Sequence, residues 1–114
     1  TYDVAYYSES VKSALQLIKA EGYEILKIKN YWANKTYKGI NTIIVKDGQK
    51  FELQFHTVSS FDLKDGDSHR LYKILRTTSV ADSSARSKLI SELEALWNDI
   101  ETPQDILSIG VLLN

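Results

Sequence analysis

The sequence predicts one α+β domain, α/β-like in its element order, in which helices flank a mixed β-sheet that contains a β-hairpin. Its 114 residues suit a single hydrophobic core. Two strand-like runs flank Asp47-Gly48, a dipeptide typical of two-residue hairpin turns. Helical spacing of apolar residues appears both before and after this hairpin. An antiparallel hairpin that follows a strand–helix–strand pattern indicates a mixed sheet.

The N-terminal part reads as a strand followed by a helix. Tyr2–Tyr7 is predicted to be the first strand, and a helix is predicted from Ser8 or Ser10 to about Glu21. Gly22 follows at the position where glycine commonly ends a helix. The apolar residues of this helix recur with helical spacing: Val11, Ala14, Leu15 and Ile18.

Two further strands are predicted before the Asp-Gly turn. Tyr23–Tyr31 is rich in Ile and Tyr, and we expect Leu26 and Ile28 to face the core. Trp32–Lys38 is predicted to be a polar loop. Gly39–Lys46 then carries a run of β-branched residues, which is typical of a strand.

The strand after the turn alternates strictly between apolar and polar residues. Its apolar members are Phe51, Leu53 and Phe55, and its polar members are Glu52, Gln54 and His56. A two-residue loop fixes the pairing as Val45 with Lys50, Ile43 with Glu52 and Asn41 with Gln54. Glu52, Gln54 and Asn41 should therefore share one surface, with Tyr37 at its mouth. The alternative is an ordinary half-buried strand whose polar face is solvated.

The C-terminal half is predicted to be mostly helical. Val58–Ser68 is predicted to be a loop or a short irregular helix, and Ser68–Thr77 a helix. A longer helix should start at Asp82 and run to about Ile100. The residues expected to face inward from these two helices are Leu71, Ile74, Leu75, Leu89, Leu93, Leu96, Trp97 and Ile100. Thr102-Pro103 is predicted to start a last helix, and the apolar tail Ile106–Leu113 to dock on the sheet.

Composition and charge narrow the classes of function. A net charge of −1 argues against bulk DNA binding, and no stretch has the length and apolar character of a membrane segment. The absence of cysteine excludes thiol catalysis. Residues 25–46 contain five lysines and no acid, with Tyr31, Trp32 and Tyr37 among them. This combination favours a site for a small anionic ligand such as a nucleotide, and the alternative is a solvated lysine face beside core aromatics.

Four segments in this order resemble the second half of a RelA/SpoT-type (p)ppGpp synthetase domain. They are Lys29-Asn30-Tyr31, Tyr37-Lys38-Gly39-Ile40-Asn41, Phe51-Glu52-Leu53-Gln54-Phe55-His56-Thr57 and His69-Arg70-Leu71-Tyr72-Lys73. The resemblance covers roughly residues 1–76, and the pairing of Tyr37 with Glu52-x-Gln54 is its specific core. It implies a synthetase-like (nucleotidyltransferase-like) fold.

Departures from the synthetase pattern resemble the toxin branch of this family. Asn30 stands where the synthetases have Asp, Asn41 where they have His, and His56 where they usually have Arg. Such variants are similar to C-terminal domains of polymorphic or contact-dependent bacterial toxins. The resemblance therefore implies a secreted or delivered bacterial effector that acts in the target-cell cytoplasm, together with a cognate immunity protein. That partner should be acidic if it covers Lys27–Lys38.

The resemblance also implies a reaction, transfer of pyrophosphate from ATP to the 3′-hydroxyl of an acceptor nucleotide or of a tRNA 3′ end, with Mg²⁺ as cofactor. Glu52 would be the general base or a metal ligand, and Gln54 would orient the strand face or the ribose. Tyr37 would stack on the acceptor base. The remaining nucleotide-binding residues implied are Lys29, Lys35, Asn41 and His56, of which the two lysines and the histidine would neutralise developing charge.

Completeness of the predicted enzyme is a separate question. Family members carry their ATP-phosphate residues and a metal-binding Asp before the strand that matches Tyr2–Tyr7. We therefore expect residues 1–114 to form a single domain of this type without its N-terminal ATP-binding part, as a fragment of a larger enzyme or as a catalytically incomplete relative. The alternative function is a nucleotide- or protein-binding module of the same fold. A third reading is an RNA-targeting toxin that holds a tRNA end on Lys27–Lys38.

Overall fold

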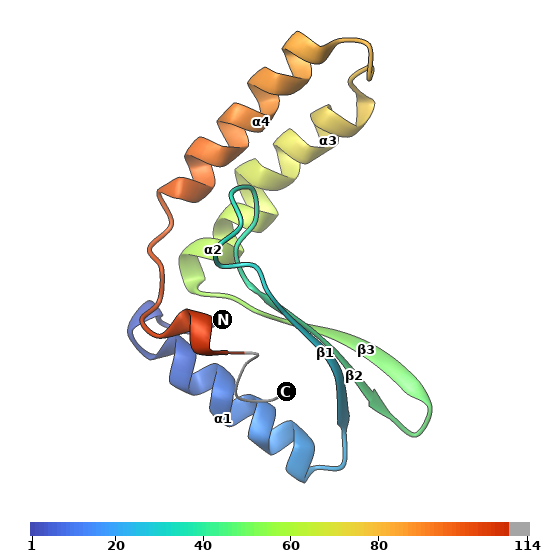
Figure 1. Ribbon diagram of the computed structural model, residues 1–114, viewed down its shortest axis with the longest axis vertical. Helices are drawn as coiled ribbons and strands as arrows, with labels where there is room; N and C mark the ends of the chain where they lie inside the picture. Colours follow the sequence, from blue (N-terminus) through green and yellow to red (C-terminus); the bar gives the residue numbers. More distant parts are fainter. Residues whose placement is uncertain (110–114) are drawn as a thin grey trace.

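The computed structural model describes residues 1–109 as an α+β arrangement built on a three-stranded sheet (Figure 1). The strands lie in the order β1 (Glu24–Asn30), β2 (Ile40–Lys46) and β3 (Gln49–Phe55). The longer helices are α1 (Tyr7–Ala20), α3 (His69–Thr77) and α4 (Ser83–Asn98). Figure 1 shows α1 on one side of the sheet, and α3 and α4 extending away from its end.

This projection of α3 and α4 makes the molecule long and thin. Its principal extents are 49 × 34 × 22 Å, and its radius of gyration is 16.0 Å. A compact domain of this length has a radius of gyration of about 13 Å. The molecule therefore consists of a sheet region, packed against α1, and a helical hairpin joined to one end of it.

The predicted first strand is wrong. The segment forms a 3₁₀ turn, η1 (Val4–Tyr6), which leads directly into α1, and the side chain of Asp3 caps η1 by accepting a hydrogen bond from the Ala5 N–H. Only Tyr2 pairs with the sheet region, through an isolated parallel bridge to Thr57. The reason lies in the spacing: Tyr7 is four residues before Val11 and extends the buried stripe of the helix by one turn.

The next two elements follow the predictions except at one position. Gly22 ends α1 with a positive φ of 93°, as expected of a glycine at this position. β1 contains a bulge between Ile25 and Lys27. The extra residue turns Leu26 outward, so the prediction that it faces the core is wrong, whereas Ile25 and Ile28 pack against the core.

The hairpin prediction is confirmed in both turn and register. Asp47 and Gly48 both have positive φ, 53° and 77°, as a type I′ turn requires. The pairs Asn41–Gln54, Ile43–Glu52 and Val45–Lys50 oppose each other as predicted. All pairings between β1, β2 and β3 are antiparallel, so the predicted mixed sheet is wrong. Of residues 2–7, which would have supplied another strand, residues 4–6 form η1 and Tyr7 begins α1.

The segment after the sheet is an irregular helix, which is one of the two structures predicted for it. It comprises α2 (Val58–Leu63) and a π-helical turn, η2 (Lys64–Ser68), before α3 begins. Asp82 caps α4 as predicted, by accepting a hydrogen bond from the Ala85 N–H. Ile74 is exposed on α3, so its predicted inward orientation is wrong, because the short two-helix hairpin covers only the side of α3 that carries Leu71.

The predicted helix at Thr102-Pro103 does not form. The chain stays irregular until a short 3₁₀ turn, η3 (Ile106–Ser108), which follows Asp105 in the left-handed region at φ 58°. This arrangement brings Ile106 and Ile109 into the core, in agreement with the predicted docking of the tail. The rest of that tail, residues 110–113, lies outside the described residues.

The main core lies between α1, η3 and one face of the sheet. Its buried members include Tyr7, Val11, Leu15, Trp32, Ile40, Phe55, Ile106 and Ile109. The Tyr7 hydroxyl donates a hydrogen bond to the Phe55 carbonyl and accepts one from Trp32 Nε1 at 3.1 Å, so its burial is compensated. Burial also raises the pKa of Tyr7. Within residues 1–109, no helix has the length and apolar character to cross a bilayer.

Candidate functional site

The face of the sheet opposite α1 carries most of the predicted site residues. Because side chains alternate along a strand, β1 presents Lys27 and Lys29 on the face where β2 presents Asn41 and β3 presents Glu52 and Gln54. The main core lies on the other face, and Lys27, Lys29 and Glu52 are exposed. The predicted grouping of Asn41, Glu52 and Gln54 on one surface is therefore confirmed by the strand register.

A chain of hydrogen bonds connects five residues across this surface. The Tyr37 hydroxyl donates to Asn41 Oδ1 at 2.7 Å and lies 3.1 Å from His56 Nε2. His56 Nε2 also lies 3.3 Å from Gln54 Oε1, and Gln54 Nε2 donates to Glu52 Oε1 at 2.7 Å. The position of the exposed carboxylate is thus linked, through an amide and an imidazole, to the loop that carries Tyr37.

The hydrogen-bond partners of His56 in this network assign its tautomer. The amide of Gln54 gives its N–H to Glu52 and turns its oxygen toward His56, so His56 Nε2 must carry a hydrogen. The Tyr37 hydroxyl already donates to Asn41 and can therefore accept from the same N–H. His56 Nδ1 is then free to accept from Ser60 Oγ at 2.9 Å. A neutral imidazole protonated on Nε2 agrees with the contacts to Gln54 and Tyr37, and the single hydroxyl hydrogen of Ser60 is shared between His56 Nδ1 and the Thr57 carbonyl.

The surroundings of His56 keep it neutral. Its side chain is 3% exposed, and burial lowers its pKa to about 4, with the charges of Lys64 and the N-terminus acting in the same direction. Ser60 contacts His56 Nδ1 and is itself fixed by a capping box with Thr57 at the start of α2. At neutral pH the imidazole therefore contributes position and hydrogen bonding, rather than positive charge, to this surface.

The position of Tyr37 is also fixed by packing. Its ring packs edge-on against the rings of Tyr31, His56 and Trp97, with centroids 5.5, 5.7 and 5.6 Å away. Its side chain is half-buried, and burial raises its pKa to about 12, with the charge of Glu52 acting in the same direction. Gly39 makes this packing possible, because a Cβ there would lie 2.7 Å from His56 Cε1. Tyr37 is thus a fixed wall of the site.

We call the face of the sheet opposite α1 the open face. A small hollow of about 90 Å³ lies on it beside Glu52. The side chains that give it chemical character are Lys27, Lys29, Tyr31, Asn41 and Glu52. Two ammonium groups, an aromatic ring, an amide and a carboxylate thus meet at one place. Ammonium groups suit phosphate, and an aromatic ring suits a nucleobase.

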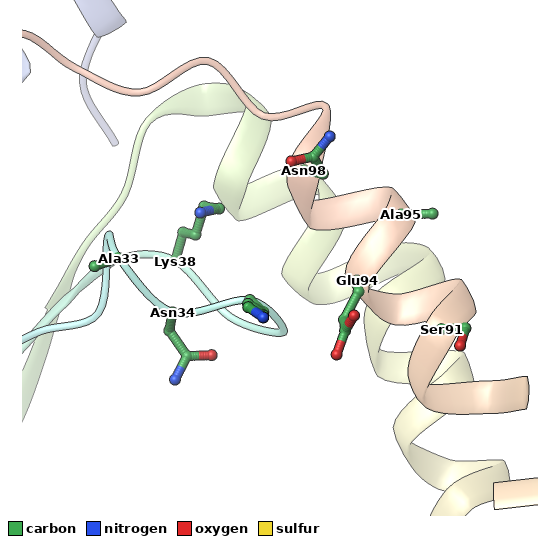
Figure 2. Close-up of a pocket in the computed structure, with 8 residues that line it drawn as sticks. Ala33, Asn34, Lys38, Ser91, Glu94, Ala95 and Asn98 are labelled. Carbon is green, nitrogen blue, oxygen red and sulfur yellow. The ribbon is translucent and has the colours of Figure 1, made fainter. Parts of the chain in front are cut away.

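Lys35 does not belong to this group. It lines a separate cleft of about 430 Å³ between the loop of residues 31–39 and α4 (Figure 2). Of the predicted residues, the structure therefore brings together Lys29, Tyr37, Asn41, Glu52, Gln54 and His56, and places Lys35 on another surface.

Three residues of the site had no individual role assigned from the sequence: Lys27 and Tyr31 were predicted only as members of the basic-aromatic segment of residues 25–46, and Ser60 was not predicted. Tyr31 and Lys27 line the hollow, and the alternation Lys27-x-Lys29-x-Tyr31 along one strand was a signal that could have placed them there. Ser60 holds His56, and its spacing from Thr57 is that of a capping box. By contrast, the packing of Trp97 on Tyr37 joins residues 60 positions apart, and no local pattern indicates it.

The donor set near Glu52 limits how a metal could bind. Residues 1–109 contain no group of three or more His, Cys, Asp or Glu side chains arranged to hold a metal ion. Among the described residues that line the hollow, Glu52 supplies the one carboxylate. Mg²⁺ is commonly held by one or two carboxylates together with substrate phosphates. The residues present fit a magnesium ion that arrives with a phosphorylated ligand.

Comparison with known proteins adds no relative to this picture. No protein-family model, curated protein or solved structure matches the chain.

Proposed function

We propose that the open face of the sheet binds a nucleotide and that the protein transfers pyrophosphate from ATP to the 3′-hydroxyl of that nucleotide or of a tRNA 3′ end, with release of AMP as the bond between the α- and β-phosphates breaks. The observation that carries this proposal is the hydrogen-bonded chain from Tyr37 through His56 and Gln54 to Glu52, beside the hollow with Lys27, Lys29 and Tyr31. A nucleotide needs this combination of cationic, aromatic and polar groups in one place.

Each residue has a role in the proposed reaction that its environment supports. Glu52 is exposed, so its carboxylate can reach a ligand hydroxyl and accept its proton while Gln54 holds it in place. Lys27 and Lys29 supply positive charge for phosphates. His56, neutral and buried, positions Gln54 and Tyr37. When present, Mg²⁺ would be held by Glu52 and would supply positive charge that stabilises the phosphates.

The aromatic role is divided between two tyrosines in this proposal. Tyr37 was expected to stack on the acceptor base, and its ring is surrounded by Tyr31, His56 and Trp97. Tyr31 is the tyrosine that lines the hollow itself. We therefore propose that Tyr37 fixes the orientation of Tyr31 through their edge-on contact and that Tyr31 provides the ring nearest the base.

The biological setting belongs to the same proposal. As a delivered bacterial toxin, the protein would modify nucleotides or tRNA in the target cell and would require an immunity protein in the producing cell. The exposed lysines at positions 27 and 29 on the open face favour an acidic partner. A partner that covers this face would block the ligand site directly.

A second candidate function is nucleotide binding without chemistry. It is favoured by the single available carboxylate in the hollow and by the absence of a larger metal-binding group in residues 1–109. In this case the open face would serve recognition alone, and Glu52 would contact a ribose hydroxyl without activating it.

A transfer assay separates the two functions. The protein, in its natural full-length form, would be incubated with ATP, Mg²⁺ and, in turn, GDP, GTP, ADP and tRNA, and products would be read by mass spectrometry. We expect a product that carries an added pyrophosphate, with its rate reduced at least about 100-fold in Glu52→Gln. The matched control is Glu24→Gln, an exposed carboxylate on β1 outside the hollow, which should keep full activity.

The outcomes are distinct. A product that forms equally well in Glu52→Gln would contradict the proposed role of Glu52. Nucleotide binding that depends on Lys29, without any product, would establish the binding module. If no nucleotide binds at all, both functions fail.

A further inference from the structure

A second cleft lies away from Glu52, between the loop of residues 31–39 and the C-terminal half of α4. Its volume is about 430 Å³, which falls within the range of small-molecule sites. Figure 2 shows that the loop contributes Asn34 and Lys38 and that the facing helix contributes Ser91, Glu94 and Asn98. Lys35 also lines the cleft from the loop.

The loop wall of this cleft is held in place by contacts on both sides. Tyr72 on α3 donates a hydrogen bond to the Thr36 carbonyl at 2.9 Å, and the Tyr37 ring packs on Trp97 of α4. Asn34 Oδ1 accepts from the Thr36 N–H at 3.0 Å, and Lys38 Nζ donates to the Trp32 carbonyl at 3.1 Å. A loop fixed in this way loses little conformational entropy when a ligand binds.

Some charged groups and hydrogen-bond donors in the cleft are not used by contacts within the protein. The ion pairs within residues 1–109 are Lys64–Asp65 and Arg70–Asp67. Neither Lys35 nor Glu94 takes part in them. Lys38 uses one of its three hydrogens on the Trp32 carbonyl and keeps two. The cleft thus offers two ammonium groups at the loop and a carboxylate at the helix.

This division of charge specifies a ligand with two chemically different ends. The ammonium groups suit a phosphate, whereas a carboxylate and an amide suit a pair of neighbouring hydroxyl groups. The described residues that line the cleft include no aromatic side chain, so a nucleobase would find no ring to stack on.

We propose that this cleft is a second binding site, which takes a phosphorylated sugar with its phosphate on Lys35 and Lys38 and its hydroxyl groups on Glu94 and Asn98. The sugar phosphate could be free or form part of a nucleotide. The proposal does not depend on the transfer reaction, since the cleft and the hollow beside Glu52 share no lining residue.

Binding of three probes tests this site: ribose 5-phosphate, AMP and inorganic phosphate, each titrated by calorimetry and followed by amide NMR. We expect Lys35→Ala to weaken ribose 5-phosphate about tenfold. Glu94→Gln should weaken ribose 5-phosphate but strengthen inorganic phosphate, because it removes hydroxyl recognition and also a repulsive charge. In the cleft, AMP and ribose 5-phosphate should bind within about threefold of each other, since the base lacks a stacking partner there.

Two variants serve as matched controls. Lys88→Ala removes an exposed lysine from the same helix, outside the cleft, and should leave all three affinities unchanged. Glu52→Gln should leave the binding of ribose 5-phosphate to the cleft unchanged, as followed by the amide signals of the loop and α4, which separates this site from the nucleotide site proposed on the open face. Since Lys35 and Glu94 are exposed, their variants should keep the native amide spectrum outside the cleft.

Three results would overturn the proposal. They are failure of ribose 5-phosphate to bind at millimolar concentration, equal affinity in the protein and in Lys35→Ala, and loss of binding in Glu52→Gln.

Discussion

The two faces of the three-stranded sheet differ in almost every respect. One face packs Ile28, Leu53 and Phe55 into the core against α1 and the C-terminal turn, whereas the other exposes Lys29 and Glu52. A single alternation along each strand produces both faces. The comparison indicates that stability comes mainly from one face, and that the other is free to carry charged and polar groups for a ligand.

His56 is an exception to this division into a buried and an exposed face. By alternation from Glu52 and Gln54 it belongs to the open face, yet its side chain is 3% exposed. β3 stops at Phe55, and Thr57 then caps α2, which brings Ser60 against the imidazole. The polar chain on the open face is therefore anchored at one end in the interior, which makes the position of Glu52 depend on buried contacts.

The largest effect should come from a change behind the covered face. Leu15 on α1 is 0% exposed, so Leu15→Ala should lower the free energy of unfolding by about 2–5 kcal/mol through lost burial and the cavity left behind. Leu17→Ala, two residues along the same helix, is the matched control, because Leu17 is 62% exposed. It should change the free energy of unfolding by less than about 0.5 kcal/mol. Urea unfolding followed by circular dichroism measures the free energy of unfolding of both variants. Similar losses for the two variants would contradict the conclusion that stability comes mainly from the covered face.

An intermediate effect should appear at His56 as the pH falls. Its pKa is about 4 in the folded protein against an ordinary value of 6.5, so between these values the unfolded chain binds a proton that the folded protein does not. The stability that this group provides is therefore complete above about pH 6.5 and is lost as the pH falls toward 4. The loss should reach at most about 3 kcal/mol.

Comparison with His56→Gln isolates this effect from that of the carboxylates. The free energies of unfolding of the two proteins, measured at a series of pH values, should converge as the pH falls from about 7 to about 4. A constant difference between them over this range would show that His56 is solvated and does not anchor the open face.

The smallest effect on stability should come from the open face. Lys29→Ala removes an exposed side chain and should change the free energy of unfolding by less than about 0.5 kcal/mol, while nucleotide binding weakens. Ile28→Ala, one residue earlier on the same strand, should cost about 2 kcal/mol, because Ile28 packs against the core. Thermal unfolding of the two variants, with nucleotide binding measured in parallel, tests this difference. A large loss of stability in Lys29→Ala would mean that the open face is covered in solution.

Local rules were sufficient for much of the fold. Asp47-Gly48 determined the hairpin and its register, and this register was enough to place Asn41, Glu52 and Gln54 on one surface. The caps at Gly22 and Asp82 were equally readable, because a positive φ and an N-terminal carboxylate are local requirements of a helix end.

Predictions failed where a local pattern was compatible with two structures. Residues 2–7 suited a strand or an extension of α1, and burial of Tyr7 against Trp32 and Phe55 favoured the helix. Leu26 was expected in the core, but a bulge that no sequence signal indicated turned it outward. Both outcomes depend on contacts between distant segments.

The hairpin, the three longer helices and the polar character of one sheet face can thus be predicted from the sequence, since each follows from the spacing of neighbouring residues. The tertiary structure alone decided that the sheet has three antiparallel strands, that His56 is buried and neutral, and that Lys35 faces a different cleft from Glu52. The physical reason is that burial and its effect on pKa depend on which distant segments pack together, and side-chain spacing along one strand carries no such information.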